Sequence, residues 1–209
     1  MSIELASRPT LPSVLKIKFN NGTPLRLYAD GMSRDEFYEF CLANHELRIE
    51  RSADGQLFIM PPTGSETGNH NAEITTEIGL WNRQHKLGRT FDSSTGFTLS
   101  NGAERAPDTA WIRQDRWDAL PASEKKKFAL ITPDFVLELR SGDQSLTELR
   151  EKMDEYMDSG CRLGWLVDPK NRRTYVYSEN GDIQTVKFEE VLSGADVMPG
   201  LSVRWADVI

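Results

Sequence analysis

Three residues between positions 107 and 152 are of the types that metal-assisted cleavage of a phosphodiester bond requires. Asp108 follows a proline, Glu138 lies near the end of an apolar run, and Lys152 lies in a segment with helical spacing. Hydrolysis of a phosphodiester at neutral pH needs a divalent cation that polarises the phosphate and acidifies a water. Carboxylate oxygens suit Mg2+ or Mn2+, and a lysine near the metal can stabilise developing charge. Asp108 and Glu138 are therefore candidate metal ligands, with Lys152 as their candidate partner.

The same residues also have an ordinary structural interpretation. Asp108 and Asp134 each follow a proline, as turn residues at the start of a strand do. Lys152 could be a solvated helix charge that pairs with Glu148 one turn away. Glu138 resists this interpretation, because an ionised carboxylate on a buried strand is unfavourable unless it is paired or bound to a cation. Asp134 is better interpreted as a strand-start residue than as a metal ligand.

The composition indicates a soluble globular protein. The chain has 209 residues, of which 38% are hydrophobic, and a net charge of -7. We expect one principal domain over residues 33–209, preceded by an extension or hairpin over residues 1–32. The acidic balance argues against a protein that coats nucleic acid through a basic surface, since phosphate neutralisation needs clustered Lys and Arg. It does not exclude a nuclease, in which a bound cation supplies the local positive field.

Cysteine content and hydropathy set further bounds. Cys41 and Cys161 are the only cysteines, and they show no metal-ligand spacing, so we expect no structural zinc site. The first ten residues hold no apolar run of the signal-peptide type, and no segment approaches the ~20 apolar residues of a membrane span. We therefore expect a cytoplasmic protein without membrane association.

The first half of the chain predicts short strands and two helices. A possible hairpin covers residues 14–28, and a Ser-x-x-Glu capping box at Ser33 predicts a helix after it. Residues 47–60 predict two strands around an Asp-Gly turn, the first of which carries Glu50. A helix should follow, capped by Asn69 and ended by Gly88. His70 and His85 would then be surface residues of that helix.

The second half contains the candidate site. Residues 90–99 and 105–112 predict a hairpin around Asn101-Gly102, which would place Asp108 inside a strand. Residues 113–128 form a polar excursion, either a surface insertion or a flap. Residues 129–139 predict a central strand, which a helix carrying Lys152 connects to a strand at 163–167. Such a crossover predicts one parallel pair in an otherwise antiparallel sheet. A further hairpin is expected over 173–188, followed by a packed tail.

These motifs, in this order, resemble the Uma-two family of putative restriction endonucleases. The resemblance covers the chain from about residue 33 to its end. It rests on the Pro-Asp pair at 107–108, Pro-Asp-Phe-Val-Leu-Glu-Leu at 133–139, Lys-x-x-x-Tyr-x-x-x-Gly at 152–160, and Gly-Trp-Leu-Val-Asp-Pro at 164–169.

That family is similar to the PD-(D/E)xK nuclease superfamily, and the resemblance implies an α/β, restriction-endonuclease-like fold with a mixed central β-sheet flanked by helices and additional β-hairpins. It implies that Asp108 is the first metal ligand and Glu138 the second. Lys152 would be the active-site lysine, moved from the strand to the following helix, and Glu50 a fourth, acidic member. Arg140 stands where the superfamily has its strand lysine, so the lysine role is open: it could belong to Lys152, to Arg140 in altered form, or to neither.

The resemblance implies an Mg2+-dependent endonuclease, with Mn2+ as a possible substitute, that hydrolyses DNA. A homodimer is one possible assembly. The alternative is a non-catalytic member of the same fold that serves as a binding or scaffolding module. A third hypothesis, a hydrolase with paired carboxylates such as a glycosidase, provides no role for Lys152.

Overall fold

The centre of the molecule is a six-stranded mixed sheet, and the computed structural model describes residues 27–29, 31–142 and 144–209. The strand expected at 14–19 lies outside the described residues. In the main sheet only β9 and β10 run parallel, and every other neighbouring pair is antiparallel, as the sequence predicted. The strands in spatial order are β12 (Ile183–Lys187), β11 (Arg173–Ser178), β10 (Leu163–Asp168), β9 (Phe135–Leu139), β7 (Thr109–Arg113) and β4 (Gly88–Asp92).

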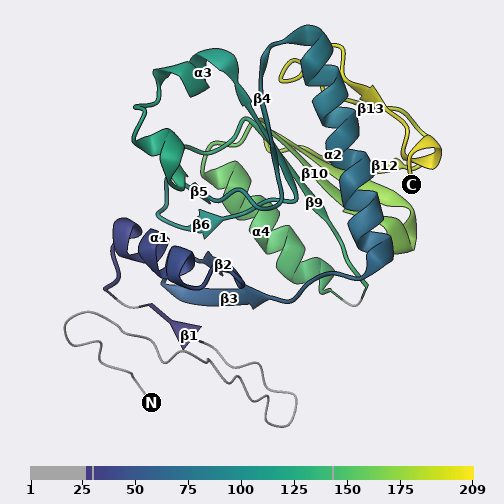
Figure 1. Ribbon diagram of the computed structural model, residues 1–209. Helices are drawn as coiled ribbons and strands as arrows, with labels where there is room; N and C mark the ends of the chain where they lie inside the picture. Colours follow the sequence, from purple (N-terminus) through teal and green to yellow (C-terminus); the bar gives the residue numbers. More distant parts are fainter. Residues whose placement is uncertain (1–26, 30, 143) are drawn as a thin grey trace.

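A second sheet lies at one end of the main sheet, below it in Figure 1. It joins four segments that are separated in sequence, and its β2 and β3 form the hairpin predicted around the Asp-Gly turn. Its strands in spatial order are β1 (Leu27–Tyr28), β3 (Gln56–Met60), β2 (Arg48–Arg51), β6 (Glu104–Arg105), β5 (Phe97–Thr98) and β8 (Ala129–Leu130). A two-stranded pair is made by β13 (Leu192–Ser193) and β14 (Ser202–Val203).

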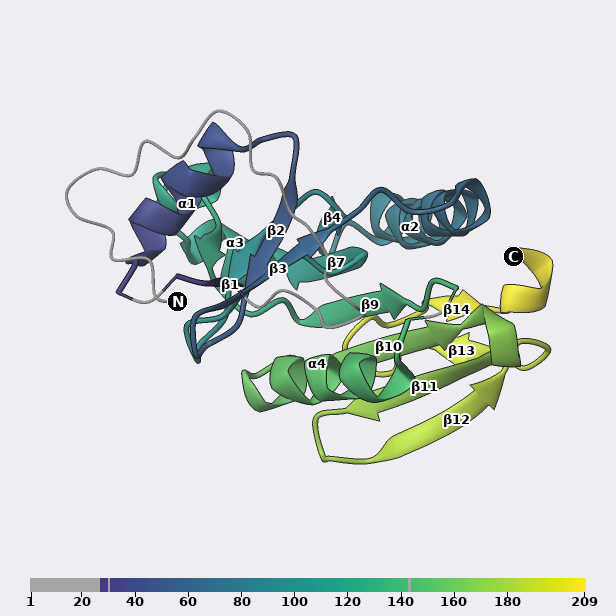
Figure 2. The same cartoon turned by 90° about the horizontal axis from the view of Figure 1, so that it is seen from below.

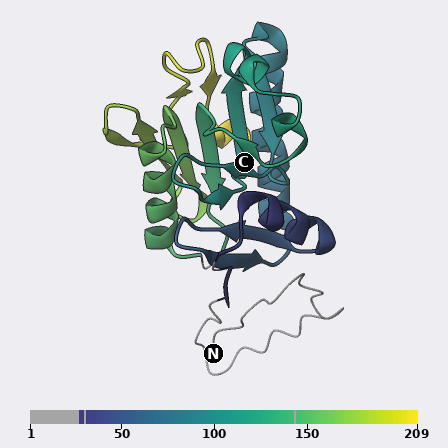
Figure 3. The same ribbon diagram turned by 90° about the vertical axis from the view of Figure 1, so that its left-hand side faces the viewer.

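Helices cover both faces of the main sheet. Figures 2 and 3 show α2 on one face and α4 on the other, with α1 beside the second sheet. None of the helices in the described part of the chain has the length and apolar character of a membrane span. The α-helices are α1 (Arg34–Ala43), α2 (Ser65–His85), α3 (Gln114–Ala119) and α4 (Leu146–Asp158), and the 3-10 helices are η1 (Glu124–Lys126), η2 (Pro169–Asn171) and η3 (Trp205–Asp207).

The two faces of β9 bury different side chains, because successive residues of a strand point to opposite sides. Leu137 and Leu139 pack in the cluster that holds the α2 residues and the C-terminal residues. Val136 packs in the cluster under α4, with Met153 and Tyr156. By this alternation the side chain of Glu138 points to the α4 face of a fully buried strand.

Local signals predicted several element ends correctly. The capping box at Ser33 is present, with its hydroxyl accepting from the Glu36 amide and the Glu36 carboxylate accepting from the Ser33 amide. Helix α4 is capped by Ser145 and ends before Gly160, which has a φ of +100°. The left-handed region favours glycine, so Gly160 stops the helix in the way the sequence indicates.

Helix α2 differs from its predicted bounds. It begins at Ser65 after Gly64 and not at Asn69, and it ends at His85. Gly88 is the first residue of β4 and not a helix stop. Its role is close packing, because a Cβ at Gly88 would lie 2.1 Å from the carbonyl oxygen of Ile112.

Two predicted strands are each divided between the two sheets. The segment 90–99 forms β4 in the main sheet and β5 in the second sheet, and the returning segment 105–112 forms β6 and β7 in the same way. Asp108 therefore lies just before β7, not inside a strand as predicted. Pro107 interrupts the ladder at this point, since proline has no amide hydrogen to donate.

Candidate functional site

Asp108 and Glu138 come from neighbouring parts of the main sheet. The antiparallel register of β7 and β9 ends with Thr109 opposite Leu137, so Asp108 comes just before the last pair and Glu138 just after it. The Asp108 Oδ2 atom accepts a hydrogen bond of 2.9 Å from the Leu139 amide. The charge of Asp108 also raises the pKa of Glu138, so the two carboxylates lie near each other.

Glu138 is held from above by helix α4. Its side chain is 4% exposed. The Tyr156 hydroxyl donates a hydrogen bond of 3.0 Å to the Glu138 Oε1 atom, and the Lys152 Nζ atom lies 2.8 Å from the same oxygen. Tyr156 and Lys152 are four residues apart on the helix, so they project from one face towards the strand. The hydrogen bonds that the described residues make to Glu138 leave its Oε2 atom free.

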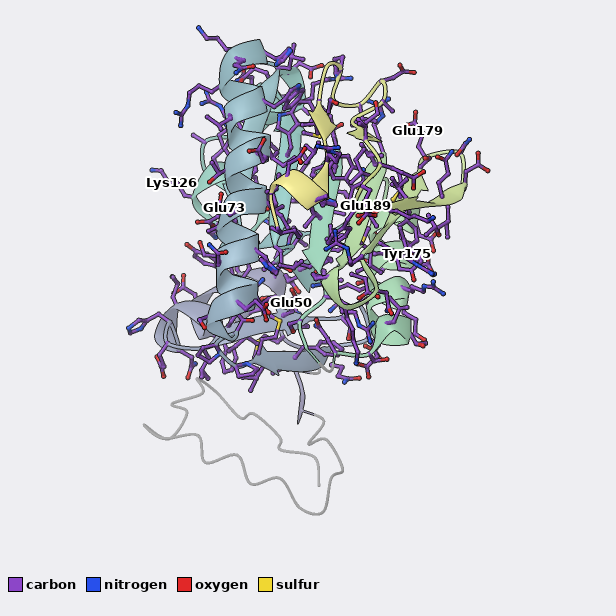
Figure 4. The ribbon with its side chains drawn as sticks, turned by 90° about the vertical axis from the view of Figure 1, so that its right-hand side faces the viewer. Glu50, Glu73, Lys126, Tyr175, Glu179 and Glu189 are labelled. Carbon is purple, nitrogen blue, oxygen red and sulfur yellow. The ribbon has the colours of Figure 1, made fainter. Side chains whose placement is uncertain are left out.

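Glu50 brings a second carboxylate to Lys152 from the other sheet. Figure 4 labels Glu50 near the junction of the two sheets. Its Oε1 atom lies 2.9 Å from Lys152 Nζ and accepts a hydrogen bond of 3.0 Å from the Ala106 amide. Its Oε2 atom lies 3.3 Å from Arg105 Nη1. The structure thus places Glu50, Glu138 and Lys152 in one cluster, with Asp108 across from Glu138.

The ion pairs of Lys152 exclude its ordinary structural interpretation as a surface charge paired with Glu148. The Lys152 side chain is 14% exposed and bridges Glu50 and Glu138. Glu148 is exposed, one turn nearer the start of α4. The buried ammonium is therefore shared between carboxylates of both sheets.

The pKa values in this cluster reflect three carboxylates around one ammonium. Burial raises the pKa of Glu138 to about 7, and the Asp108 and Glu50 carboxylates add to this rise while Lys152 opposes it. For Glu50 burial acts in the same direction, but Lys152 and Arg105 hold its pKa below the ordinary value. Burial would lower the pKa of Lys152, yet Glu138 and Glu50 raise it. Lys152 is thus cationic at neutral pH, whereas Glu138 is near its titration point.

Arg140 lies in a separate ion pair. Its Nη1 atom is 2.9 Å from Oδ2 of the fully buried Asp168, and its Nε donates a hydrogen bond of 2.9 Å to the Gln144 carbonyl. The structure therefore brings Lys152, and not Arg140, to Glu138.

Asp134 has the structural role expected of a strand-start residue. It is fully buried, its Oδ2 atom accepts from the Arg113 amide at 2.8 Å, and its Oδ1 atom lies 2.9 Å from Arg116 Nη1. His85 lies on the surface of α2, where its Nδ1 atom contacts the Trp81 carbonyl at 2.9 Å.

Sequence reasoning missed three residues that hold the site together. Arg105 links Glu50 to Glu155 of α4, and Arg48 lies with Nη2 at 3.5 Å from the Asp108 Oδ1 atom. Tyr156 was part of the Lys-x-x-x-Tyr motif but had no assigned role. A signal for Arg48 does exist, because it lies two residues before Glu50 and so shares its strand face.

The donor set fits a cation that keeps most of its water. Mg2+ is commonly bound by one or two carboxylates with waters completing its shell. Asp108 and Glu138 supply two neighbouring carboxylates, and burial together with the Asp108 and Glu50 charges raises the pKa of Glu138, a penalty that a bound cation would relieve. Among the described residues no group of three or more His, Cys, Asp or Glu side chains is arranged to hold a metal. The residues present therefore fit a two-carboxylate site.

Comparisons with known proteins identify a family that the chain matches and a solved structure with a similar fold. The family model described as "Uma2: Putative restriction endonuclease" matches residues 34–207. The chain is also similar to the crystal structure of a "putative nuclease belonging to DUF820" from Anabaena variabilis ATCC 29413, with a TM-score of 0.67 and 20% identity over 78% of this chain and 90% of that chain. At that identity the likeness shows the fold, and it confirms the α/β, restriction-endonuclease-like architecture. No curated protein matches the chain.

Proposed function

Because the chain belongs to the Uma2 family, described as "Putative restriction endonuclease", we propose that it is a metal-dependent endonuclease that hydrolyses DNA phosphodiester bonds. One observation carries the proposal. The Lys152 ammonium lies 2.8 Å from Glu138, and the nearby Asp108 carboxylate acts on Glu138 through its charge. Two converging carboxylates beside a buried lysine are the groups that metal-assisted phosphodiester cleavage requires.

Asp108 and Glu138 would hold Mg2+, or Mn2+ in its place. The bound cation would polarise the phosphate and lower the pKa of a water. The chain's own residues prepare this site. Tyr156 and Lys152 occupy the Oε1 atom of Glu138, which directs its Oε2 atom to another ligand. The Leu139 amide similarly occupies one oxygen of Asp108.

Lys152 would act on the substrate through its charge. Its Nζ atom can donate a hydrogen bond to the attacking water or to a phosphate oxygen, where negative charge develops. A lysine in this role needs a fixed position, and Glu50 supplies it at 2.9 Å. Glu50 is in turn fixed by the Ala106 amide and by Arg105. We therefore assign Glu50 as a positioning residue.

A cleavage assay tests the proposal. Supercoiled, linear duplex and single-stranded DNA are incubated with the protein in Mg2+, in Mn2+ or in EDTA. We expect cleavage only with a cation, and a loss of about 100-fold or more in Asp108→Asn, Glu138→Gln and Lys152→Met. Glu148→Gln is the matched control on α4, because Glu148 is exposed and one turn from Lys152. Equal cleavage by wild type and the three variants would refute the assignment.

A non-catalytic binding module of the same fold is the second candidate. It is favoured by the ion pairs of Lys152, which give Glu138 and Glu50 a partner without a metal ion. Calorimetry separates the two candidates. A nuclease should bind Mg2+ through Asp108 and lose this binding in Asp108→Asn, whereas a scaffold should bind DNA without binding the cation.

A further inference from the structure

Phe58 of β3 exposes an aromatic ring beside the candidate site. Its side chain is 38% exposed, and no other Phe, Tyr or Trp among the side chains that the structure describes is exposed to this extent. Single exposed apolar residues are normal on protein surfaces and need no explanation. The position of Phe58 relative to the site is what gives its exposure meaning.

The register of β2 and β3 places Phe58 on the face that forms the site. Phe58 lies directly opposite Glu50, and Met60 lies opposite Arg48. Opposite residues share a face, with Cβ atoms about 4.5–5.5 Å apart. Glu50 contacts Lys152, and Arg48 contacts Asp108. Phe58 is therefore next to the residue that positions Lys152.

A buried cation fixes the orientation of the Phe58 ring. The guanidinium carbon of Arg105 lies 5.1 Å from the ring centroid, which is within the range of a cation–π contact. Arg105 is itself 8% exposed and is paired with both Glu50 and Glu155. The ring thus rests on an immobile group while more than a third of its side chain stays in solvent.

We propose that Phe58 is a stacking platform for an unpaired base next to the scissile phosphate, so that the preferred substrate is DNA with unpaired bases. This inference rests on the function proposed above. A fixed, exposed aromatic ring can stack any base, since every base has a π face. Bases inside a duplex are already stacked and paired, and an aromatic ring beside the backbone does not reach them. Stacking therefore selects single-stranded, frayed or looped DNA.

The charges of the molecule agree with this substrate class. The net charge is -7, and Arg48, Arg105 and Lys152 are each engaged with a carboxylate. Affinity for duplex DNA comes largely from neutralised phosphates, which need cations that are free to make those contacts. Because these three cations beside the site are already engaged, base stacking can supply affinity there, and it depends less on phosphate contacts.

Equilibrium binding tests the inference without requiring cleavage. A short single strand that carries 2-aminopurine and a dye label is titrated with protein, in EDTA and in Ca2+, beside a duplex of the same sequence. Phe58→Leu removes the ring but keeps an apolar side chain, and Phe58→Trp keeps a stacking surface. Ile183→Ala is the control, because Ile183 is an exposed apolar residue of β12 at the far edge of the main sheet.

We expect wild type, Phe58→Trp and Ile183→Ala to bind the single strand more tightly than the duplex and to quench 2-aminopurine. Phe58→Leu should lose about 10-fold in single-strand affinity, since alanine substitutions at stacking residues lose about 5- to 150-fold. In cleavage it should raise KM and leave kcat unchanged. Unaltered single-strand affinity in Phe58→Leu would overturn the inference.

Two other outcomes separate this inference from the proposed function. If the wild type cleaves duplex DNA and shows no preference for single strands, the nuclease proposal is supported and the role of Phe58 is overturned. Binding that depends on Phe58 without any cleavage would support the stacking role and refute the nuclease. If Phe58→Leu instead reduces self-association in sedimentation with no change in oligonucleotide affinity, the ring belongs to a contact between copies of the chain, which also overturns the inference.

Discussion

Removal of the Lys152 ammonium should leave two buried carboxylates without the cation that they share. The Lys152 side chain is 14% exposed, whereas Glu50 and Glu138 are 3% and 4% exposed. Lys152→Met keeps most of the side-chain volume, so the change tests charge more than packing. The two carboxylates would then face each other and Asp108 with the ammonium gone.

The structure indicates the size of the effect. Breaking a buried ion pair by removing one partner lowers the free energy of unfolding by about 3–5 kcal/mol. The lower end, about 3 kcal/mol, applies here, because Glu50 keeps Arg105 and the Ala106 amide. Among the residues that the structure describes, Glu138 keeps only the hydrogen bond from the Tyr156 hydroxyl, but its pKa is already about 7, so it can take up a proton. The loss of stability should therefore be larger at about pH 8 than at about pH 6.

Urea unfolding followed by tryptophan fluorescence measures the effect at both pH values. The double variant Lys152→Met/Glu138→Gln should recover part of the loss, which gives a coupling energy for this pair. The matched cycle uses Glu148→Gln, which is expected to show no coupling because Glu148 is exposed. A wild-type free energy of unfolding in Lys152→Met, or equal coupling to Glu148 and Glu138, would refute the reasoning.

Three further predictions follow from the same contacts. The pKa of Glu138 is raised from 4.5 to about 7, so the folded state holds the Glu138 proton more tightly than the unfolded state does, and this stabilisation is lost as the pH rises from about 4.5 through about 7. Glu138→Gln should therefore flatten the dependence of the free energy of unfolding on pH, measured in EDTA. An unchanged slope would contradict the prediction. Arg140→Met should lower the free energy of unfolding by about 3 kcal/mol, because it removes the ion-pair partner of the buried Asp168. The rate of cleavage per folded molecule should stay at the wild-type value. A loss of cleavage would indicate that Arg140, and not Lys152, has the role of the active-site lysine. Gly88→Ala should lower the free energy of unfolding by about 3 kcal/mol, because the added Cβ would clash with the Ile112 carbonyl. Gly79→Ala has open space around it and should stabilise α2 by about 0.8 kcal/mol. Thermal unfolding of both variants tests these two values.

The parts of the fold that depend on neighbouring residues were predictable. The Ser33 capping box and the turn at Asn101-Gly102 are local structures, and the hydrogen bonds that stabilise them join residues two or three positions apart. The central position of β9 was predictable too, because a strand buried on both faces has a continuous apolar sequence. The same reasoning identified Glu138 as a residue that needs a partner.

The divided strands could not be predicted, because strand propensity does not say which sheet a residue joins. Residues 90–99 have the composition of one strand, but β4 pairs with β7 and β5 pairs with β6 in different sheets. The partners of Glu50 were hidden for the same reason. Its contacts with Arg105 and Lys152 span 55 and 102 residues, and no local pattern encodes such distances.

The position of Lys152 explains how a chain with arginine at 140 can still present an ammonium at Glu138. Arg140 follows Glu138 by two residues and so starts from the same face of the sheet, but its guanidinium is paired with Asp168. Helix α4 covers that face and delivers Lys152 to within 2.8 Å of the carboxylate. Since transition-state stabilisation depends on where a charge lies and not on the element that carries it, strand and helix lysines are physically equivalent at this point. A buried ion pair is weak evidence for stability, and burial, with the Asp108 and Glu50 charges adding to it, raises the pKa of Glu138 to about 7. The function that we propose gives such a cluster a purpose, since a cation held by Asp108 and Glu138 would offset the buried negative charge.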